Sequence, residues 1–225
     1  MIRRTLGTFS ILLMAAAPLA AQGGMAGMHH DDDHKIAGGP LPTGWMGRTD
    51  DSTSKAEDVR FVAEGKGWHV TSGPAAIYWN DKSTVKGPFT ASVTITQTKL
   101  SGQHPEAYGI FFQGSNLKAA NQSYAYFQVR GDGQVMVNHR AGKEVHKIIE
   151  WTPNPGARKA DATGKATNTL TVDTTRPDSI RMFINGTPVA AIDATHFGSP
   201  DGIVGVRVNH NLDVQLTDFI ITPKK

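Results

Sequence analysis

The sequence has no cysteine among its 225 residues. This absence excludes disulfide bonds and catalysis by a thiol, so stability must come from a hydrophobic core or from a bound metal. Beyond the N-terminal region no apolar run approaches the length of a membrane span, and Lys and Arg are scattered along the chain. A nucleic-acid partner and a stable membrane span are therefore not expected. The Gly-x-Ser-x-Gly, P-loop and dinucleotide-binding motifs are missing as well.

The N-terminus has the three parts of a secretory signal peptide. Arg3 and Arg4 precede an apolar run from about residue 6 to residue 17, and small residues follow up to Ala21. The run is too short for an ordinary membrane span, so we expect residues 1–21 to be cleaved and the protein to be periplasmic or secreted. An uncleaved anchor is the alternative. Cleavage removes two of the 23 basic residues and leaves 21 against 20 acidic ones, which is almost charge balance.

Residues 22–43 are rich in Gly, Pro and charge and show no periodicity, which indicates a flexible spacer. Its stretch MHHDDDH (28–34) contains His29, His30 and His34, which are suitable ligands for a transition metal. A flexible segment specifies no coordination geometry. The two interpretations are an exposed, weakly chelating spacer and a segment that recruits a metal.

From residue 44 to residue 225 the sequence predicts one all-β domain. Short runs of strand-forming residues are separated by turn signals such as Asn185-Gly186, which favours a two-residue hairpin. The segment FTASVTITQTK (89–99) alternates apolar and polar residues most regularly. Such spacing predicts an antiparallel two-sheet sandwich of the jelly-roll type. Residues 152–166 lack a core pattern and are expected to form a long loop.

One predicted strand, SYAYFQVR (123–130), separates apolar side chains from polar and aromatic ones. Successive side chains of a strand point to opposite faces. Sugar sites combine aromatic faces with planar amide and guanidinium groups, so the polar phase is a candidate binding surface. An ordinary solvated sheet face is the alternative. The candidate contacts on this strand and on the strand at 202–209 are Tyr124, Tyr126, Gln128, Arg130, Arg207 and Asn209.

Three histidine neighbourhoods are candidates for proton transfer. His104 lies two residues before Glu106 at the entry to a strand, and the other two are His139 and His210 at strand ends. Histidine exchanges a proton near neutral pH, and a nearby carboxylate can orient it. Each of these histidines alone is also compatible with a surface or loop-capping role.

Four stretches together resemble the concanavalin A-like lectin/glucanase superfamily. They are HPEAYGIFFQGSNL (104–117), YAYFQVRGDGQVMVNHRAG (124–142), SIRMFINGTPVAAI (179–192) and GIVGVRVNHNLDVQLTDF (202–219). Within it, the sequence is most similar to exported bacterial 3-keto-disaccharide hydrolase-like domains. The resemblance implies a jelly roll whose concave sheet holds carbohydrate, and elimination or hydration chemistry on oxidised glycosides. The Gly-Trp…Leu-Phe-Asp-Gly-Lys opening usual in that group is replaced here by GWMGRTDDSTSK (44–55).

Glutamate is scarce, which limits the glycosidase chemistry that the chain can perform. Retaining glucanases of this superfamily carry a Glu-x-Asp-x-x-Glu run, because nucleophile and acid must lie about 5 Å apart. None of the five glutamates lies in such a run. Retaining chemistry of this type is therefore not expected, whereas an inverting pair assembled from distant segments stays open.

The leading hypothesis is an exported domain that binds or processes a glycoside. As an enzyme it would be a hydrolase or lyase acting on a keto-glycoside, with Arg130 or a bound divalent metal stabilising the enolate. Two other functions remain open: a non-catalytic glycan-binding module, and a structural or assembly protein of the envelope.

Overall fold

The structure is a computed structural model that describes residues 32–51, 53–55 and 58–224. The predicted signal peptide and two candidate metal ligands, His29 and His30, lie outside the described residues. From residue 32 to residue 43 the chain has no helix or strand, and His34 is exposed. Hydrogen bonds attach this part of the predicted spacer to the domain, because the His34 backbone N–H donates to Asn211 Oδ1 at 2.7 Å.

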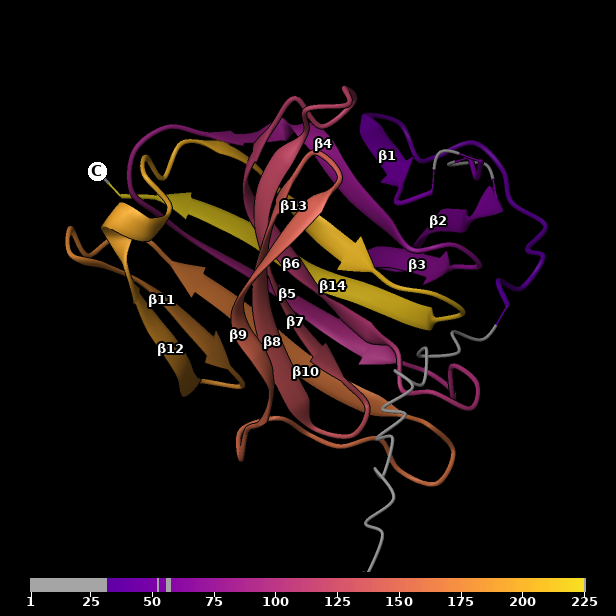
Figure 1. Ribbon diagram of the computed structural model, residues 1–225. Helices are drawn as coiled ribbons and strands as arrows, with labels where there is room; N and C mark the ends of the chain where they lie inside the picture. The colour runs from indigo at the N-terminus through magenta and orange to yellow at the C-terminus, as the bar shows by residue number, and fades with distance from the viewer. Residues whose placement is uncertain (1–31, 52, 56–57, 225) are drawn as a thin grey trace, which may run out of the picture. The chain divides into compact units, whose positions relative to one another are not determined.

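Two antiparallel sheets form the domain, and this confirms the predicted all-β sandwich. The front sheet faces the viewer in Figure 1 and has the strand order β1-β4-β13-β6-β7-β8-β9. Its strands are β1 (Trp45–Thr49), β4 (Ala76–Val85), β13 (Gly202–Val208), β6 (Ala107–Ser115), β7 (Ser123–Arg130), β8 (Gln134–Ala141) and β9 (Glu144–Pro153).

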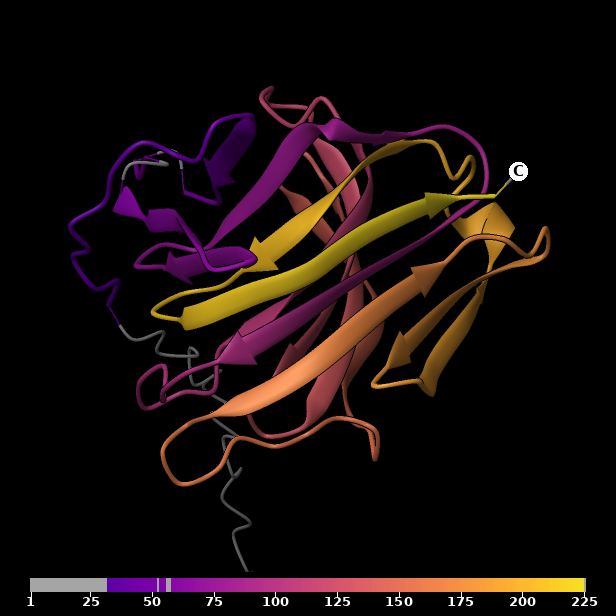
Figure 2. The ribbon, with the colours of Figure 1, turned by 180° about the vertical axis from the view of Figure 1, so that it is seen from behind.

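The back sheet, seen from its outer side in Figure 2, has the order β12-β11-β10-β5-β14-β3-β2. Its strands are β12 (Thr187–Asp193), β11 (Ser179–Ile184), β10 (Ala166–Asp173), β5 (Phe89–Gln97), β14 (Asp213–Pro223), β3 (Gly67–Thr71) and β2 (Arg60–Glu64). A short 3-10 helix (Ala194–His196) precedes β13. In the described part of the chain no helix is long and apolar enough to cross a membrane.

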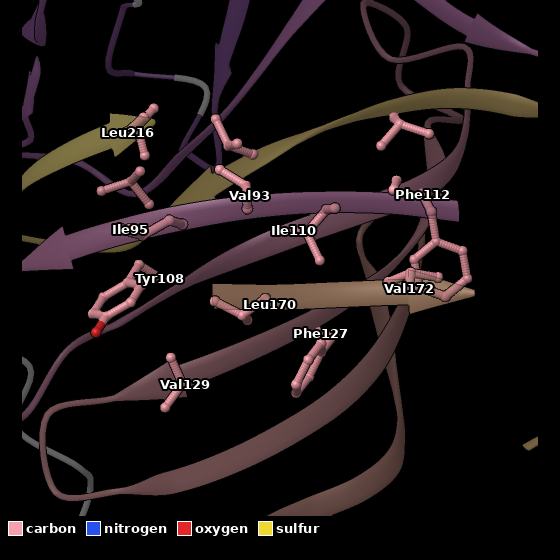
Figure 3. Close-up of a cluster of buried hydrophobic side chains, with 14 of the residues drawn as sticks. Val93, Ile95, Tyr108, Ile110, Phe112, Phe127, Val129, Leu170, Val172 and Leu216 are labelled. Carbon is pink, nitrogen blue, oxygen red and sulfur yellow. The ribbon is translucent and has the colours of Figure 1, made fainter. Parts of the chain in front are cut away.

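The core lies between the sheets and follows from the alternation of the sequence. Val93 and Ile95 of β5 and Leu170 of β10 pack with Ile110 of β6 and Phe127 of β7 (Figure 3). The residues of β5 between these positions point outward, so β5 has one buried and one polar face. Burying a side chain of this size stabilises the fold by about 1.5–3 kcal/mol.

Turn chemistry fixes the β7–β8 hairpin, which carries much of the candidate surface. The turn is Gly131-Asp132-Gly133, and Gly133 has a φ of 84°, which a residue with a side chain rarely adopts. The Asp132 carboxylate accepts a hydrogen bond from the Gln134 backbone N–H at 3.1 Å and from Arg130 Nε at 2.8 Å. The three residues Arg130-Gly131-Asp132 therefore stabilise this turn.

A bulge in β13 places the following residues of that strand against β4 and β6. The register shifts between Ile203 and Gly205. A Cβ atom at Gly205 would lie 2.3 Å from the Phe111 ring and 2.3 Å from the Tyr78 carbonyl oxygen. Glycine is thus required for this close approach, and Arg207 follows two residues later on the front sheet.

Candidate functional site

The two phases of β7 point to opposite faces of the front sheet, as the alternation predicts. Phe127 and Val129 belong to the core between the sheets. Tyr124 and Tyr126 belong to a second cluster, on the outer face, together with residues of β4 and β6. The centres of the two tyrosine rings lie 5.6 Å apart. The outer face therefore has its own packed aromatic layer.

An ion cluster lies over these tyrosines. Arg207 of β13 donates two hydrogen bonds to Asp50, Nη1 to Oδ1 at 2.9 Å and Nη2 to Oδ2 at 2.5 Å. Arg140 of β8 donates from Nη2 to the same Asp50 Oδ2 at 3.3 Å. The Arg207 guanidinium lies 4.9 Å from the centre of the Tyr126 ring and donates to Tyr124 OH at 3.2 Å. We call Asp50, Arg140 and Arg207 the Asp50 clamp.

The clamp joins parts of the sheet that are not neighbours. β6 and β7 separate β13 from β8, and the strand register places Arg207 level with Met136, four residues before Arg140. Both side chains reach one carboxylate, which comes from the segment after β1. The clamp thus holds that segment across the outer face and covers the tyrosines.

Burial corrects the sequence-based interpretation of this face. The exposed fractions of Tyr124, Tyr126, Gln128 and Arg207 are 1%, 3%, 0% and 5%, so these side chains form a layer beneath the surface instead of lining it. Alternation identified the correct face, but it contains no information about the clamp that covers the two tyrosines. Only those residues of this face that remain exposed can contact a ligand directly.

Several buried polar atoms of the outer face have no hydrogen-bond partner among the described residues. They are Gln122 Oε1, Gln128 Oε1, Asn138 Oδ1, Arg140 Nε and Arg207 Nε. The same Asn138 side chain donates from Nδ2 to Tyr126 OH at 3.2 Å, so its orientation is fixed while its oxygen stays unpaired. Buried polar groups are normally paired, and such orphan atoms mark positions where water or a ligand hydroxyl completes the network.

The electrostatics of the clamp keep Asp50 ionised. Burial opposes ionisation, but the charges and hydrogen bonds of Arg207 and the charge of Arg140 outweigh it, so the pKa of the Asp50 carboxyl lies below its ordinary value. A carboxyl in this state accepts hydrogen bonds well and is a poor proton donor at neutral pH. It therefore does not fit the role of a glycosidase acid.

One hollow borders the clamp, and a second hollow adjoins the first. The larger, which we call the Asp50 hollow, has a volume of about 840 Å³. It is lined by Gly47, Arg48, Thr49, Asp50, Asp51, Ser54, Lys118, Ala120, Gln122, Arg140, Gly142 and Lys143. The second, of about 390 Å³, is mostly apolar and includes Met46, Trp79 and Leu117. Lys118 lines both, so the two hollows adjoin at the connection between β6 and β7.

The far end of β7 has a different character. Arg130 lies 4.6 Å from the centre of the partly exposed Trp151 ring and forms an ion pair with Asp132, with Nη2 and Oδ2 2.8 Å apart. Gln128 Nε2 donates to Asn209 Oδ1 at 3.0 Å. Of the predicted contacts, Arg130 and Asn209 are those that remain partly exposed.

The histidine neighbourhoods do not come together. His104 is exposed and Glu106 is half-exposed, and both lie just before β6. His210 comes directly after Asn209, whose backbone N–H donates a hydrogen bond to the carbonyl oxygen of Ala107 at 2.9 Å. These three residues therefore share the sheet end that holds Arg130. His210 also pairs with the Asp33 carboxylate, at 2.5 Å from Nδ1.

His139 lies at the opposite end of the sheet. It pairs with Ala125 of β7, whereas Ala107 pairs with Arg130 of the same strand. Ala125 and Arg130 are five residues, or roughly 17 Å, apart along β7. It has the opposite phase to Asn138 and lines a separate hollow of about 240 Å³. Its Nε2 lies 2.9 Å from Ser123 Oγ. His139 thus cannot act with His104, Glu106 or His210 on one reacting atom.

The candidate metal ligands give no assembled site in the described part of the chain. His34 is exposed, and no group of three or more His, Asp or Glu side chains there is placed to hold a metal ion. His29 and His30 lie outside the described residues, so a metal-recruiting spacer stays a prediction.

Sequence reasoning missed four residues of this face: Asp50, Asn138, Arg140 and Trp151. Asn138 and Arg140 share a phase of β8, and the alternation in QVMVNHR (134–140) could have placed them beside Tyr124 and Tyr126. Asp50 carried no such signal, because it lies in a segment between strands.

No protein-family model matches the sequence, and a search of curated proteins finds no match. Solved structures do share the fold. A Bacillus subtilis protein of unknown function with a galectin-like fold has a TM-score of 0.56 at 11% identity, over 79% of this chain and 88% of that one. A Bacillus licheniformis β-glucanase has a TM-score of 0.53 at 10% identity, over 84% and 96%.

A glycoside hydrolase family 16 endo-glucanase from Bacteroides ovatus has a TM-score of 0.52 at 9% identity, over 76% of this chain and 92% of that one. At these identities the likeness establishes architecture and not activity. The chain therefore has the jelly-roll β-sandwich fold of the concanavalin A-like lectins and glucanases.

Proposed function

We propose that this protein is an exported glycan-binding domain that holds its ligand in the Asp50 hollow, on the outer face of the front sheet. The observation that carries the proposal is the set of fixed but unpaired polar atoms at this face, among them Gln122 Oε1 and Arg140 Nε beside the hollow. Planar amides and guanidinium groups suit sugar hydroxyls, which both donate and accept. A volume of about 840 Å³ lies within the range of ligand sites.

The fold is compatible with this proposal and does not carry it. The glucanase and the endo-glucanase are named as enzymes, whereas this sequence lacks the Glu-x-Asp-x-x-Glu run described above and its Asp50 is kept ionised by two arginines. A site that holds a sugar by hydrogen bonds needs no proton donor. Binding is therefore better supported than retaining hydrolysis.

A glycan array probed with the purified full chain tests the proposal. We expect a restricted set of glycans to bind and Arg140→Ala to weaken this binding at least about tenfold, because Arg140 lines the hollow. The matched control is Arg181→Ala on the back sheet, which should bind as the unaltered protein does. Circular dichroism spectra establish that both variants are folded. An array without any bound glycan contradicts the proposal.

A second candidate is hydrolase or lyase action on a 3-keto-glycoside. It is favoured by one observation: His104, Glu106 and His210 share a sheet end with Arg130, which would stabilise an enolate. Incubation with 3-keto-glucosides, with and without added divalent metal, should then release ultraviolet-absorbing products. Glu106→Gln should abolish turnover and leave binding in the Asp50 hollow intact. Absence of product under both conditions rules this candidate out.

Export is part of the proposal and has its own test. In a bacterial host the mature protein should be recovered outside the cytoplasm with Gln22 as its first residue. N-terminal sequencing measures this directly. Retention of residues 1–21 on a membrane-bound product would instead identify an uncleaved anchor.

A further inference from the structure

We propose that the Asp50 hollow selects acidic glycans, meaning sugars that carry a carboxylate or a sulfate ester. This inference rests on the proposed glycan-binding function and specifies its ligand class. It follows from three features of the hollow: an excess of positive charge, a fixed acceptor for hydroxyl groups and the arrangement of two flanking lysines.

The charge balance of the lining is positive. Its cationic residues are Arg48, Lys118, Arg140 and Lys143, against the acids Asp50 and Asp51. Arg207, behind Asp50, already forms two hydrogen bonds to that carboxylate. Asp51 accepts a hydrogen bond from the Thr53 backbone N–H at 2.8 Å. Both acids stay negatively charged, but four cationic residues against two acidic ones leave the lining with an excess of positive charge, which concentrates ligands of negative charge.

The cations differ in what holds them. Arg48 Nη1 donates to the carbonyl oxygens of Leu117 (2.9 Å) and Ala119 (2.5 Å), so Arg48 braces the β6–β7 connection and keeps its charge beside the hollow. Lys118 and Lys143 are exposed and have no carboxylate within ion-pair distance among the described residues. Lys118 lies on the β6–β7 connection and Lys143 in the β8–β9 turn, and both line the hollow, so an acidic group there lies close to two lysines.

The acceptor distinguishes a sugar from a simple anion. Gln122 is 3% exposed and its Oε1 has no donor among the described residues. Its backbone is fixed on both sides, since its N–H donates to Ala119 at 3.2 Å and its carbonyl accepts from Gly142 at 2.7 Å. A sulfate ion offers this oxygen no proton at neutral pH, whereas a sugar hydroxyl does. Cations for the acid and an acceptor for a hydroxyl together describe an acidic sugar.

Isothermal titration calorimetry on the purified full chain tests the inference with three probes: tetragalacturonate, its carboxyl-reduced neutral form and a sulfated galactan tetrasaccharide. We expect at least one acidic probe to bind about tenfold or more tightly than the neutral form, and the preference to shrink with added salt. Lys118→Ala/Lys143→Ala should remove most of this preference. The control pair Lys66→Ala/Lys86→Ala removes the same charge outside the hollow and should leave it unchanged.

Each outcome has one meaning. Binding of the uronate alone or of the sulfated sugar alone assigns the acid, and binding of both supports the shared anionic chemistry. Equal affinity for the neutral form, or an equal loss in both lysine pairs, overturns the inference while the glycan-binding function stands. A single-stranded oligothymidylate that binds as tightly as the acidic sugars overturns it as well, because charge alone would then explain the affinity. If no glycan binds in the array either, the proposed function itself fails.

Discussion

The outer faces of the two sheets share the same alternating sequence pattern, but one is partly exposed to solvent and the other is largely buried. On the back sheet, Thr94 of β5 and Thr169 of β10 exchange a hydrogen bond of 2.9 Å at a partly exposed surface. On the front sheet, Tyr124 and Tyr126 occupy the equivalent kind of position and are almost fully buried beneath the Asp50 clamp. A polar strand face is thus solvated in one sheet and built into a layered site in the other. What differs is the segment that crosses it.

The largest expected difference between the two faces concerns their arginines. Arg207→Met leaves the Asp50 carboxylate without its main partner in a mostly buried place, and we expect a loss of about 3 kcal/mol in the free energy of unfolding. Arg181→Met breaks the pair with the Asp173 carboxylate on the back sheet and should cost less than about 1 kcal/mol. Urea denaturation at pH 7 measures both. Equal losses would mean that the clamp is an ordinary surface ion pair.

On the back sheet, the contribution of the Asp213 carboxylate to the free energy of unfolding should depend on pH. Burial opposes ionisation of Asp213, but hydrogen bonds from Thr98 and His69 outweigh it and lower the pKa of its carboxyl from 3.8 to about 2. The carboxylate therefore stabilises the fold above the unfolded pKa, and this contribution is lost as the pH falls from about 4 towards about 2. Asp213→Asn should cost about 1 kcal/mol at pH 7 and almost nothing at pH 2. If the difference in urea midpoint between Asp213→Asn and the unaltered protein does not change with pH, this assignment is wrong.

Removing a single hydroxyl group from each face should change the stability less than removing an arginine does, and the two faces should still differ. Tyr126→Phe takes the partner from the buried Asn138 amide, and we expect a loss of about 1 kcal/mol. Thr94→Val removes a hydroxyl from the partly exposed Thr94–Thr169 pair and should change the stability by less than about 0.5 kcal/mol. Thermal or urea unfolding of the two variants gives the comparison, and the reverse order would show that the outer face of the front sheet is hydrated.

The smallest expected effect is the titration of His139. Burial, with the nearby His146, lowers the pKa of His139 below 6.5. Because the unfolded chain binds the proton more readily, this residue contributes stability above pH 6.5 that declines as the pH falls through its folded pKa. NMR should place its titration below 6.5, and His146→Ala should raise it slightly while burial keeps it low. A pKa above 6.5 would show that His139 is solvated.

Local sequence patterns specify the strands, their two phases and several turns. The period of two placed Phe127 and Val129 in the core and Tyr124 and Tyr126 outside it, and Asn185-Gly186 forms the predicted β11–β12 turn with φ values of 50° and 80°. These features depend on residues close together in the chain, which is why local patterning specifies them.

Which polar face is covered, and which distant residues come into contact, depends on the assembly of the two sheets. Asp50 lies 90 positions from Arg140 and 157 positions from Arg207 along the chain, and no local pattern links them. Their contact depends on the order of strands in the front sheet and on the path of the segment after β1. The same long-range order separated His139 from His104 and brought Lys118 and Lys143 to one hollow. Strand faces follow from alternation, which is local, whereas a site needs side chains that only the assembled sheets bring together.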